Sequence, residues 1–282
     1  MKYVFLTIVV LIIAAFLYYE DYKIDITNYK ITSRDIATTV KIVHLSDLHS
    51  SPRKKVLEHI RTIRPDLIFI TGDYINEKGK NKDKMLSYGK ELLAIAPVYY
   101  ITGNHERRLD YFSELMDELR GIGFNVLLDE IESVTVNGSV INLLGLDENQ
   151  ADHSDYKARK EGTFVYKDES HLFNELSGMD GFKIVLSHFP ENFAGVSEMN
   201  YSQYDFDLQL SGHAHGGQFI LPFIGSVFSP GQGWFPKYAR GSFGERPKLI
   251  VSRGIGNAEF PFRLFNHPEI IAIRLSKPLD KE

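Results

Sequence analysis

Three continuous apolar runs alternate with two helical segments between residues 39 and 102, and this series constrains the fold more than any other feature. The apolar runs cover residues 39–45, 66–71 and 98–102. Residues 54–64 place apolar side chains at helical spacing, and a second helix is predicted at about 84–95. Strands that are apolar throughout are buried on both faces, and their alternation with helices favours parallel pairing. The series therefore predicts an α/β fold around a covered, parallel sheet.

The rest of the chain continues without an internal repeat or a second domain boundary. Helices are predicted at about 111–120 and 170–176, and strands at 124–128, 133–136, 140–146, 182–187, 206–210, 249–252 and 269–275. Residues 147–162 are polar and are predicted to form an exposed loop, whereas residues 219–247 are rich in glycine and proline. We interpret residues 39–282 as one domain and residues 21–38 as a linker or an edge strand.

Residues 1–20 are interpreted as a transmembrane anchor. The run Tyr3–Tyr19 has no charged residue, and as a helix it would extend about 25 Å, the short end of what spans a bilayer. A signal peptide has the same appearance, but no small-x-small cleavage site precedes Glu20, and paired tyrosines suit a membrane interface. Lys2 before the run and the acidic residues after it favour an N-terminus on the inner side.

Polar motifs stand directly after five of the predicted strands. They supply Asp47, His49, Asp73, Asn104, His105, His188, His213 and His215. Each residue alone has an ordinary explanation as a helix cap, a turn residue or a solvent-facing histidine. Their shared placement is not explained in that way, because ligands of such sheets bind beyond the carboxyl ends of the strands. The set is too large for one metal ion and suits two ions bridged by a carboxylate.

The order of these motifs resembles that of the calcineurin-like metallophosphoesterases. That pattern is Asp-x-His, Gly-Asp, Gly-Asn-His-Glu, a lone His and Gly-His-x-His, and all five blocks occur in order over residues 47–215. The resemblance implies a sandwich of two mixed β-sheets flanked by helices, with a two-metal site at the sheet edges. Its activity would be hydrolysis of phosphate esters through a metal-bridging hydroxide, without a covalent intermediate.

The resemblance also implies a role for each residue. Asp47, His49 and His215 would bind the first metal ion, Asn104, His188 and His213 would bind the second, and Asp73 would bridge both. His105 would act in catalysis near the scissile phosphate without binding metal, and Glu106 would orient a histidine. Mixed Asp, His and Asn ligands suit Mn, Fe or Zn better than Mg or Ca.

Differences from the motifs of other phosphoesterase groups narrow the choice of group within the family. No Asp-Arg-Gly follows Gly72, as it would in the serine/threonine protein phosphatases, and Asn76 replaces the tyrosine ligand of the purple acid phosphatases. The Gly-His-x-His-Gly-Gly-Gln ending and the segment Ser252–Gly256 resemble the bacterial membrane-anchored group, which includes phosphodiesterases and UDP-2,3-diacylglucosamine pyrophosphatases. We therefore predict a phosphodiesterase or pyrophosphatase acting on a membrane-associated or lipid-linked phosphate substrate. It would be a single-pass protein of the bacterial cell membrane with an extracytoplasmic domain.

The residues leave alternatives open. The chain could be a phosphomonoesterase for small soluble substrates, or a membrane-tethered metal-binding protein without turnover. The apolar segment 219–228 could be a loop on the core or a membrane-facing lip, and Arg240 and Arg253 could hold a second phosphate or form surface ion pairs.

Composition excludes other partners and sites. No nucleic-acid partner is expected at a formal charge of −5, and the absence of cysteine excludes disulfides and thiolate metal sites. The sequence carries no signal of an oligomeric state. We assign no chemistry to the histidines outside the motifs, which are His44, His59, His153, His171 and His267.

Overall fold

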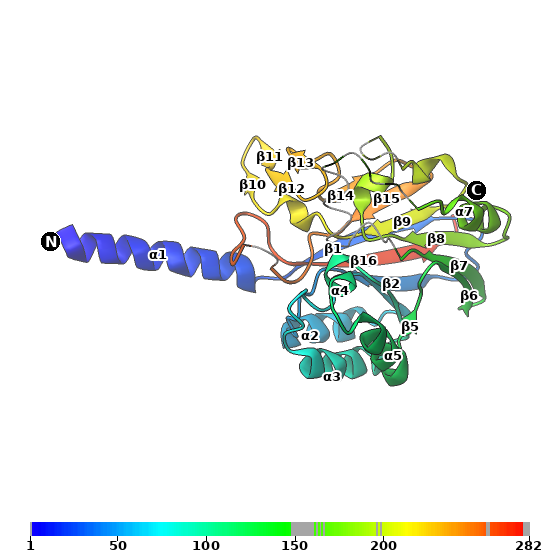
Figure 1. The fold of residues 1–282 in the computed structure, drawn as a ribbon, viewed down its shortest axis with the longest axis horizontal. Coiled ribbons are helices and arrows are strands. Elements are labelled where there is room, and N and C mark those ends of the chain that lie inside the picture. Colours follow the sequence, from blue (N-terminus) through cyan, green and yellow to red (C-terminus); the bar gives the residue numbers. More distant parts are fainter. Residues whose placement is uncertain are drawn as a thin grey trace.

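The computed structural model of this chain describes residues 2–147, 161, 163, 165, 167–195, 197, 199–257 and 260–278. Most of the predicted loop at 147–162, including His153, lies outside the described residues. Two six-stranded sheets face each other in the described part (Figure 1). The predicted sandwich of two mixed sheets flanked by helices is confirmed.

The first sheet contains the strand series that the apolar runs predicted. Its order is β1 (Asp25–Thr32), β16 (Glu269–Ser276), β2 (Val40–Leu45), β3 (Leu67–Thr71), β4 (Val98–Ile101) and β5 (Asn125–Val126). Strands β2 to β5 are parallel neighbours, whereas β16 runs antiparallel to β2. Residues 25–32, which lie between the N-terminal helix and the first predicted strand, form the edge strand β1 and pair in parallel with β16.

The second sheet has a parallel centre and antiparallel edges. Its order is β14 (Gly241–Phe243), β15 (Lys248–Val251), β9 (Leu208–Ser211), β8 (Phe182–Leu186), β7 (Ser139–Gly145) and β6 (Glu130–Val136). The predicted hairpin turn between β6 and β7 is present, with Asn137 and Gly138 both at positive φ. Two small hairpins follow β9, and they were not predicted from the glycine-rich sequence. They consist of β10 (Ile220–Leu221) with β11 (Gly225–Ser226), and β12 (Phe228–Ser229) with β13 (Gly233–Trp234).

Most of the helices cover the outer faces or connect the strands, whereas the N-terminal helix projects from one end of the sandwich (Figure 1). The helices are α1 (Lys2–Tyr22), α2 (Lys54–Ile63), α3 (Lys82–Leu93), α4 (Asn104–Arg107), α5 (Phe112–Ile122) and α7 (Ser170–Ser177), with 3₁₀ turns η2 (Pro190–Asn192), η3 (Tyr201–Gln203) and η4 (His215–Gly217). Figure 1 shows α2, α3 and α5 on the side of the first sheet that faces away from the second sheet. Buried side chains of these helices, such as Leu57, Leu92 and Leu119, pack against that face.

Successive side chains of a strand point to opposite faces of the sheet, and this produces three layers of apolar core. Leu67 and Phe69 of β3 lie between the two sheets, whereas Ile68 and Ile70 face the helices. A third cluster joins the outer face of the second sheet to α7. The central strands are therefore buried on both faces, which is the physical reason for their continuous apolar sequences. This packing holds the carboxyl ends of β2, β3, β4, β8 and β9 in fixed positions.

The helix α1 projects from one end of the sandwich, and the hairpins β10–β13 lie at that same end (Figure 1). Most of α1 is exposed, and it is long and apolar enough to cross a membrane. Its last turns contact the domain. The ring of Phe16 packs on that of Phe265 at a centroid distance of 5.6 Å, and Glu20 is buried.

Candidate metal centre

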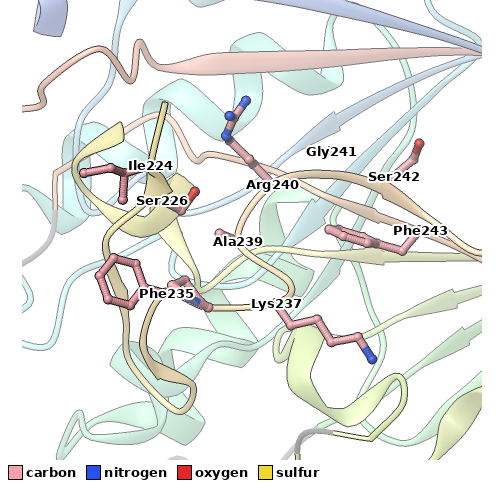
Figure 2. Close-up of a pocket in the computed structure, with 10 residues that line it drawn as sticks. Ile224, Ser226, Phe235, Lys237, Ala239, Arg240, Gly241, Ser242 and Phe243 are labelled. Carbon is pink, nitrogen blue, oxygen red and sulfur yellow. The ribbon is translucent and has the colours of Figure 1, made fainter. Parts of the chain in front are cut away.

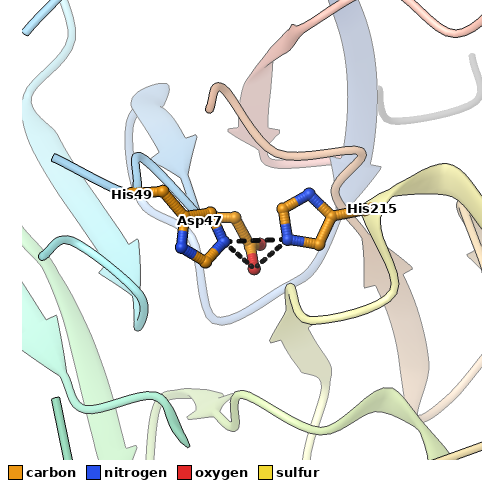
Figure 3. A group of neighbouring side chains, drawn as sticks. All are labelled: Asp47, His49 and His215. Atoms are coloured by element: carbon orange, nitrogen blue, oxygen red, sulfur yellow. Dashed lines mark hydrogen bonds and ion pairs between the residues drawn. The ribbon is translucent and has the colours of Figure 1, made fainter. Parts of the chain in front are cut away.

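The turns after the five central strands bring all eight predicted residues to one rim of the sandwich. The first group contains Asp47, His49 and His215 (Figure 3). Nε2 of His215 lies 3.2 Å from Oδ1 of Asp47, and Nε2 of His49 lies 3.8 Å from the same oxygen. The three side chains are buried and aim their ligand atoms at one point.

Asp73 lies between this group and a second one. Its Oδ2 is 3.6 Å from Nε2 of His49, 3.8 Å from Nε2 of His105 and 3.5 Å from Nε2 of His188. Oδ1 of Asn104 lies 3.1 Å from the same nitrogen of His188. The Asp73 carboxylate is thus shared by both groups. A ligand that bridges two metal ions must occupy such a position.

His213 joins the rim less directly. Its backbone N–H donates to both carboxylate oxygens of Asp47, at 3.2 and 3.1 Å, and its ring lies 5.0 Å from the ring of His188. The ring therefore stands beside His188 of the second group.

The backbone of the rim is strained where the candidate ligands stand. Five of them have positive φ, namely Asp47 at 52°, His49 at 46°, Asp73 at 52°, His213 at 63° and His215 at 47°. Such angles are unfavourable for residues with a side chain, and they persist only where the surrounding structure enforces them. The concentration of strain in these turns indicates that side-chain direction at this rim is maintained at a cost in stability.

Glycines allow the turns to approach one another closely. A Cβ on Gly103 would stand 2.3 Å from Oδ1 of Asp73, and one on Gly212 would stand 2.4 Å from Oδ2 of Asp47. Gly103 and Gly212 are therefore required by space, whereas Gly72 of the Gly-Asp motif is required by its φ of 81° as well.

The electrostatics of the rim favour cations. Burial lowers the pKa of His49 to about 3 and, together with His188, lowers that of His213 well below its ordinary value, so both rings are neutral ligands. Burial also opposes a charge on His188, but the Asp73 carboxylate outweighs it and raises the pKa of His188 to about 10. Two buried carboxylates that draw a proton onto a buried imidazole create a strongly negative potential.

The residues present fit two divalent metal ions. Nε2 of His49 and Nε2 of His215 are 2.9 Å apart, and the other nitrogen of each ring, Nδ1, is buried with no hydrogen-bond partner among the described residues. Imidazole nitrogens, carboxylates and an amide oxygen that converge at a buried site are a donor set for Mn, Fe or Zn.

His105 stands at the open side of this rim. Its Nδ1 accepts a hydrogen bond of 3.1 Å from the backbone N–H of Glu77, so the neutral ring carries its proton on Nε2. That nitrogen faces Asp73 and the candidate metal positions. The ring is thus oriented to donate a proton or a hydrogen bond into the site.

The prediction that Glu106 orients a histidine is wrong. Its Oε2 accepts hydrogen bonds of 3.0 Å from the backbone N–H groups of Asp73 and Gly103, and its Oε1 accepts one of 2.8 Å from Ile75. Burial, and then the charge of Asp73, raises the pKa of Glu106 to about 7. Glu106 therefore joins the turns after β3 and β4 through their backbones.

Two positioning features were missed from the sequence. In the segment Ser252–Gly256, the backbone N–H of Gly256 donates to the carbonyl of Asp47 at 2.7 Å, so this motif supports the first turn of the rim. Asn266 donates its side-chain amide to the carbonyl of His215 at 2.7 Å. Asn266 lies 51 residues from His215 in the chain, and no sequence pattern predicts that the two are in contact.

Of the two arginines considered for a second phosphate, Arg253 forms ion pairs instead. It lies 3.2 Å from both Asp25 and Glu269. Arg240 is exposed on a surface cavity of about 430 Å³ beside β11. Figure 2 shows Arg240 and Lys237 pointing in opposite directions there, so they do not form a paired clamp for one anion.

Comparison with known proteins agrees with this geometry. Residues 40–217 match the family model described as calcineurin-like phosphoesterase. The chain is 30% identical over 271 residues to the uncharacterized metallophosphoesterase YkuE of Bacillus subtilis, covering 92% of this chain and 87% of that protein. It is 26% identical over 253 residues to phosphodiesterase YaeI of Escherichia coli, covering 86% and 84%.

Among solved structures, the NAD nucleotidase of Haemophilus influenzae has the same fold. The TM-score is 0.52 at 18% identity, and the match covers 77% of this chain and 46% of that longer one. The resemblance drawn from the five motifs is thereby confirmed. This chain belongs to the calcineurin-like phosphoesterase family and is a metal-dependent phosphoester hydrolase.

Proposed function

We propose that this protein is a membrane-anchored phosphodiesterase or pyrophosphatase that acts on phosphate esters presented at a membrane surface. The observation that carries the membrane part is the contact between α1 and the metal-site end of the domain. Phe16 of α1 packs on Phe265, and the neighbouring Leu264 accepts a backbone hydrogen bond of 3.0 Å from Ile220 of the hairpin that follows His215. A membrane that contains α1 would therefore lie beside the rim.

The ligand sets that we propose are those that the family resemblance implies. Asp47, His49 and His215 hold the first metal ion, Asn104, His188 and His213 hold the second, and Asp73 is the shared carboxylate. This assignment is supported by the convergence of buried ligand atoms around Asp73.

Two divalent ions, when bound, supply an activated water and offset charge on the phosphate oxygens. The chain's own residues do the rest. His105 presents an Nε2 proton toward the reacting phosphate, where it can protonate the leaving oxygen or hold a phosphate oxygen. Glu106 joins the turns after β3 and β4, which would hold Asp73 and Asn104 in place for metal binding.

Exposed aromatic side chains near α1 support the membrane proposal. Phe223 and Trp234 at the hairpins and Phe260 and Phe265 in the loop before β16 are all exposed. We call these four residues the aromatic lip. Aromatic residues, tryptophan and tyrosine above all, are favoured at the boundary between lipid and water. By length and composition alone, α1 could also be a signal sequence. A signal sequence would not explain why exposed aromatic side chains gather in the aromatic lip, whereas a membrane beside the lip would.

The test is a hydrolysis panel with the full-length protein in lipid vesicles, reconstituted with Mn²⁺ or Zn²⁺. It compares a soluble phosphomonoester, a soluble phosphodiester and a lipid-linked pyrophosphate in the same vesicles. We expect the diester or pyrophosphate bond to be cleaved and the vesicle-borne substrate to be preferred. Turnover of the monoester alone would overturn the proposal, as would equal rates with and without vesicles.

A further inference from the structure

The last turn of α1 enters the domain and is buried there by polar contacts. Glu20 is 4% exposed and Asn266 is fully buried. The backbone N–H of Asn266 donates to Oε2 of Glu20 at 3.2 Å, and Nε2 of His267 lies 3.1 Å from Oε1 of the same carboxylate. The carboxylate of a helix that is otherwise exposed thus has both oxygens bonded inside the domain.

Asn266 connects Glu20 to the turn that contains His215. Its Nδ2 donates to the carbonyl of His215 at 2.7 Å and to that of Gln218 at 3.0 Å. A Cβ on Gly216 would stand 2.4 Å from Oδ1 of Asn266, so the side chain fills the turn. This turn holds His215 and Gln218 at positive φ, and the two hydrogen bonds from Asn266 oppose its relaxation.

A second path leads from the next residue of α1 to Asp47. Nδ2 of Asn257 donates to Oδ1 of Asp21 at 2.7 Å, and its Oδ1 accepts a hydrogen bond of 3.0 Å from the fully buried Arg263. Arg263 also donates to the carbonyl of Arg253 at 2.8 Å, in the segment that supports the Asp47 turn. Two acidic residues at the end of α1 therefore connect to two turns that supply the same ligand group.

We propose that the last turn of α1 is a structural part of the first metal subsite, with Glu20 and Asn266 as positioning residues for His215. The inference rests on the proposed assignment of His215 as a ligand, but not on a membrane substrate. Removal of a group that holds a metal ligand typically costs about 10- to 100-fold in metal affinity. The effect is confined to the first subsite, since none of the described contacts of Asn266 reaches Asn104, His188 or His213.

The test measures metal binding in full-length protein purified in detergent. Asn266→Ala removes both donors to the turn, Glu20→Ala removes the carboxylate that holds the Asn266 backbone, and Glu20→Gln keeps an oxygen acceptor there. The matched control is Asn142→Ala, because Asn142 is a buried asparagine of β7 whose amide donates to the carbonyl of Asp180 at 2.8 Å. Calorimetric titration with Mn²⁺ and elemental analysis give the affinity and number of ions, and thermal unfolding is followed in parallel.

We expect two ions in the unaltered protein. Asn266→Ala and Glu20→Ala should keep one ion at unchanged affinity and bind the other about 10- to 100-fold more weakly. Glu20→Gln should recover most of the loss, and Asn142→Ala should unfold at lower temperature with both affinities unchanged. If Asn266→Ala fails to fold, Glu20→Ala with its Gln counterpart decides the matter.

Two wild-type-like affinities in either alanine variant would overturn the inference and leave the proposed function standing. Equal weakening by Asn142→Ala would also overturn it, because the effect would then be general destabilisation. Fewer than two ions in the unaltered protein would overturn the two-metal assignment together with this inference.

Discussion

Nε2 of His49 lies 2.9 Å from Nε2 of His215, although 166 residues separate the two histidines in the chain. The first follows a strand of one sheet and the second follows a strand of the other, so the contact joins the two halves of the sandwich. Both nitrogens face Asp47 at 3.8 and 3.2 Å. Two imidazole nitrogens and a carboxylate that converge in strained turns form a ligand group suited to a cation.

The first prediction concerns Asp73. Because its carboxylate is shared by both ligand groups, Asp73→Asn should weaken binding at both subsites, leaving fewer than two ions per chain after dialysis. Elemental analysis of the purified protein measures this directly. The exposed Asp110→Asn is the control and should retain both ions. Retention of two tightly bound ions by Asp73→Asn would exclude a bridging role.

The second prediction separates chemistry from metal binding. His105→Ala should keep both ions but lose about two to four powers of ten in kcat, the usual contribution of acid–base catalysis. The exposed His171→Ala should keep both the ions and the rate. Loss of an ion from His105→Ala would instead make His105 a ligand, and we would then have assigned it wrongly.

The third prediction tests the close approach of the turns. In Gly212→Ala the new Cβ would stand 1.8 Å from Oγ of Ser46 and 2.4 Å from Oδ2 of Asp47. The turn after β2 must move, and we expect a loss of about 1–3 kcal/mol in the free energy of unfolding together with weaker metal binding. Chemical denaturation measures the first effect and calorimetric titration the second.

The control for that variant is Gly121→Ala. Gly121 lies in the last turn of α5, and outside the local helix backbone no described atom lies within 4 Å of a new Cβ, so this change should leave the protein as stable or stabilise it by up to about 0.5–1 kcal/mol. Unchanged metal binding by Gly212→Ala would mean that the Asp47 carboxylate is not where metal is held.

The fourth prediction tests the aromatic lip. Phe223→Ser combined with Trp234→Ser should slow hydrolysis of a vesicle-borne, lipid-linked substrate by about tenfold or more, because burial of one large apolar side chain is worth about 1.5–3 kcal/mol. Hydrolysis of a small soluble phosphodiester should be unchanged. The exposed Val140 of β7 provides a control as Val140→Ser. Equal losses on both substrates with lower thermal stability would show that the lip residues are structural.

The sequence alone determined the strand positions and the chemical types that stand after them. Largely apolar runs predicted β2, β3, β4 and β8 within one or two residues, because burial on both faces favours apolar side chains. Since the carboxyl ends of parallel strands share one edge, the motifs after them had to lie near one another. The order of residues along the chain therefore determined the ligand types, and with them the class of chemistry.

Tertiary structure alone decided the contacts that orient those ligands. Glu106 binds backbone N–H groups rather than a histidine, Arg253 pairs with two carboxylates, and Asn266 holds the turn of His215. Each of these contacts involves a partner that is distant in the chain and comes close only in the folded protein. Local sequence patterns report the period of burial along a strand, but they carry no information about which distant backbone group a polar side chain will meet.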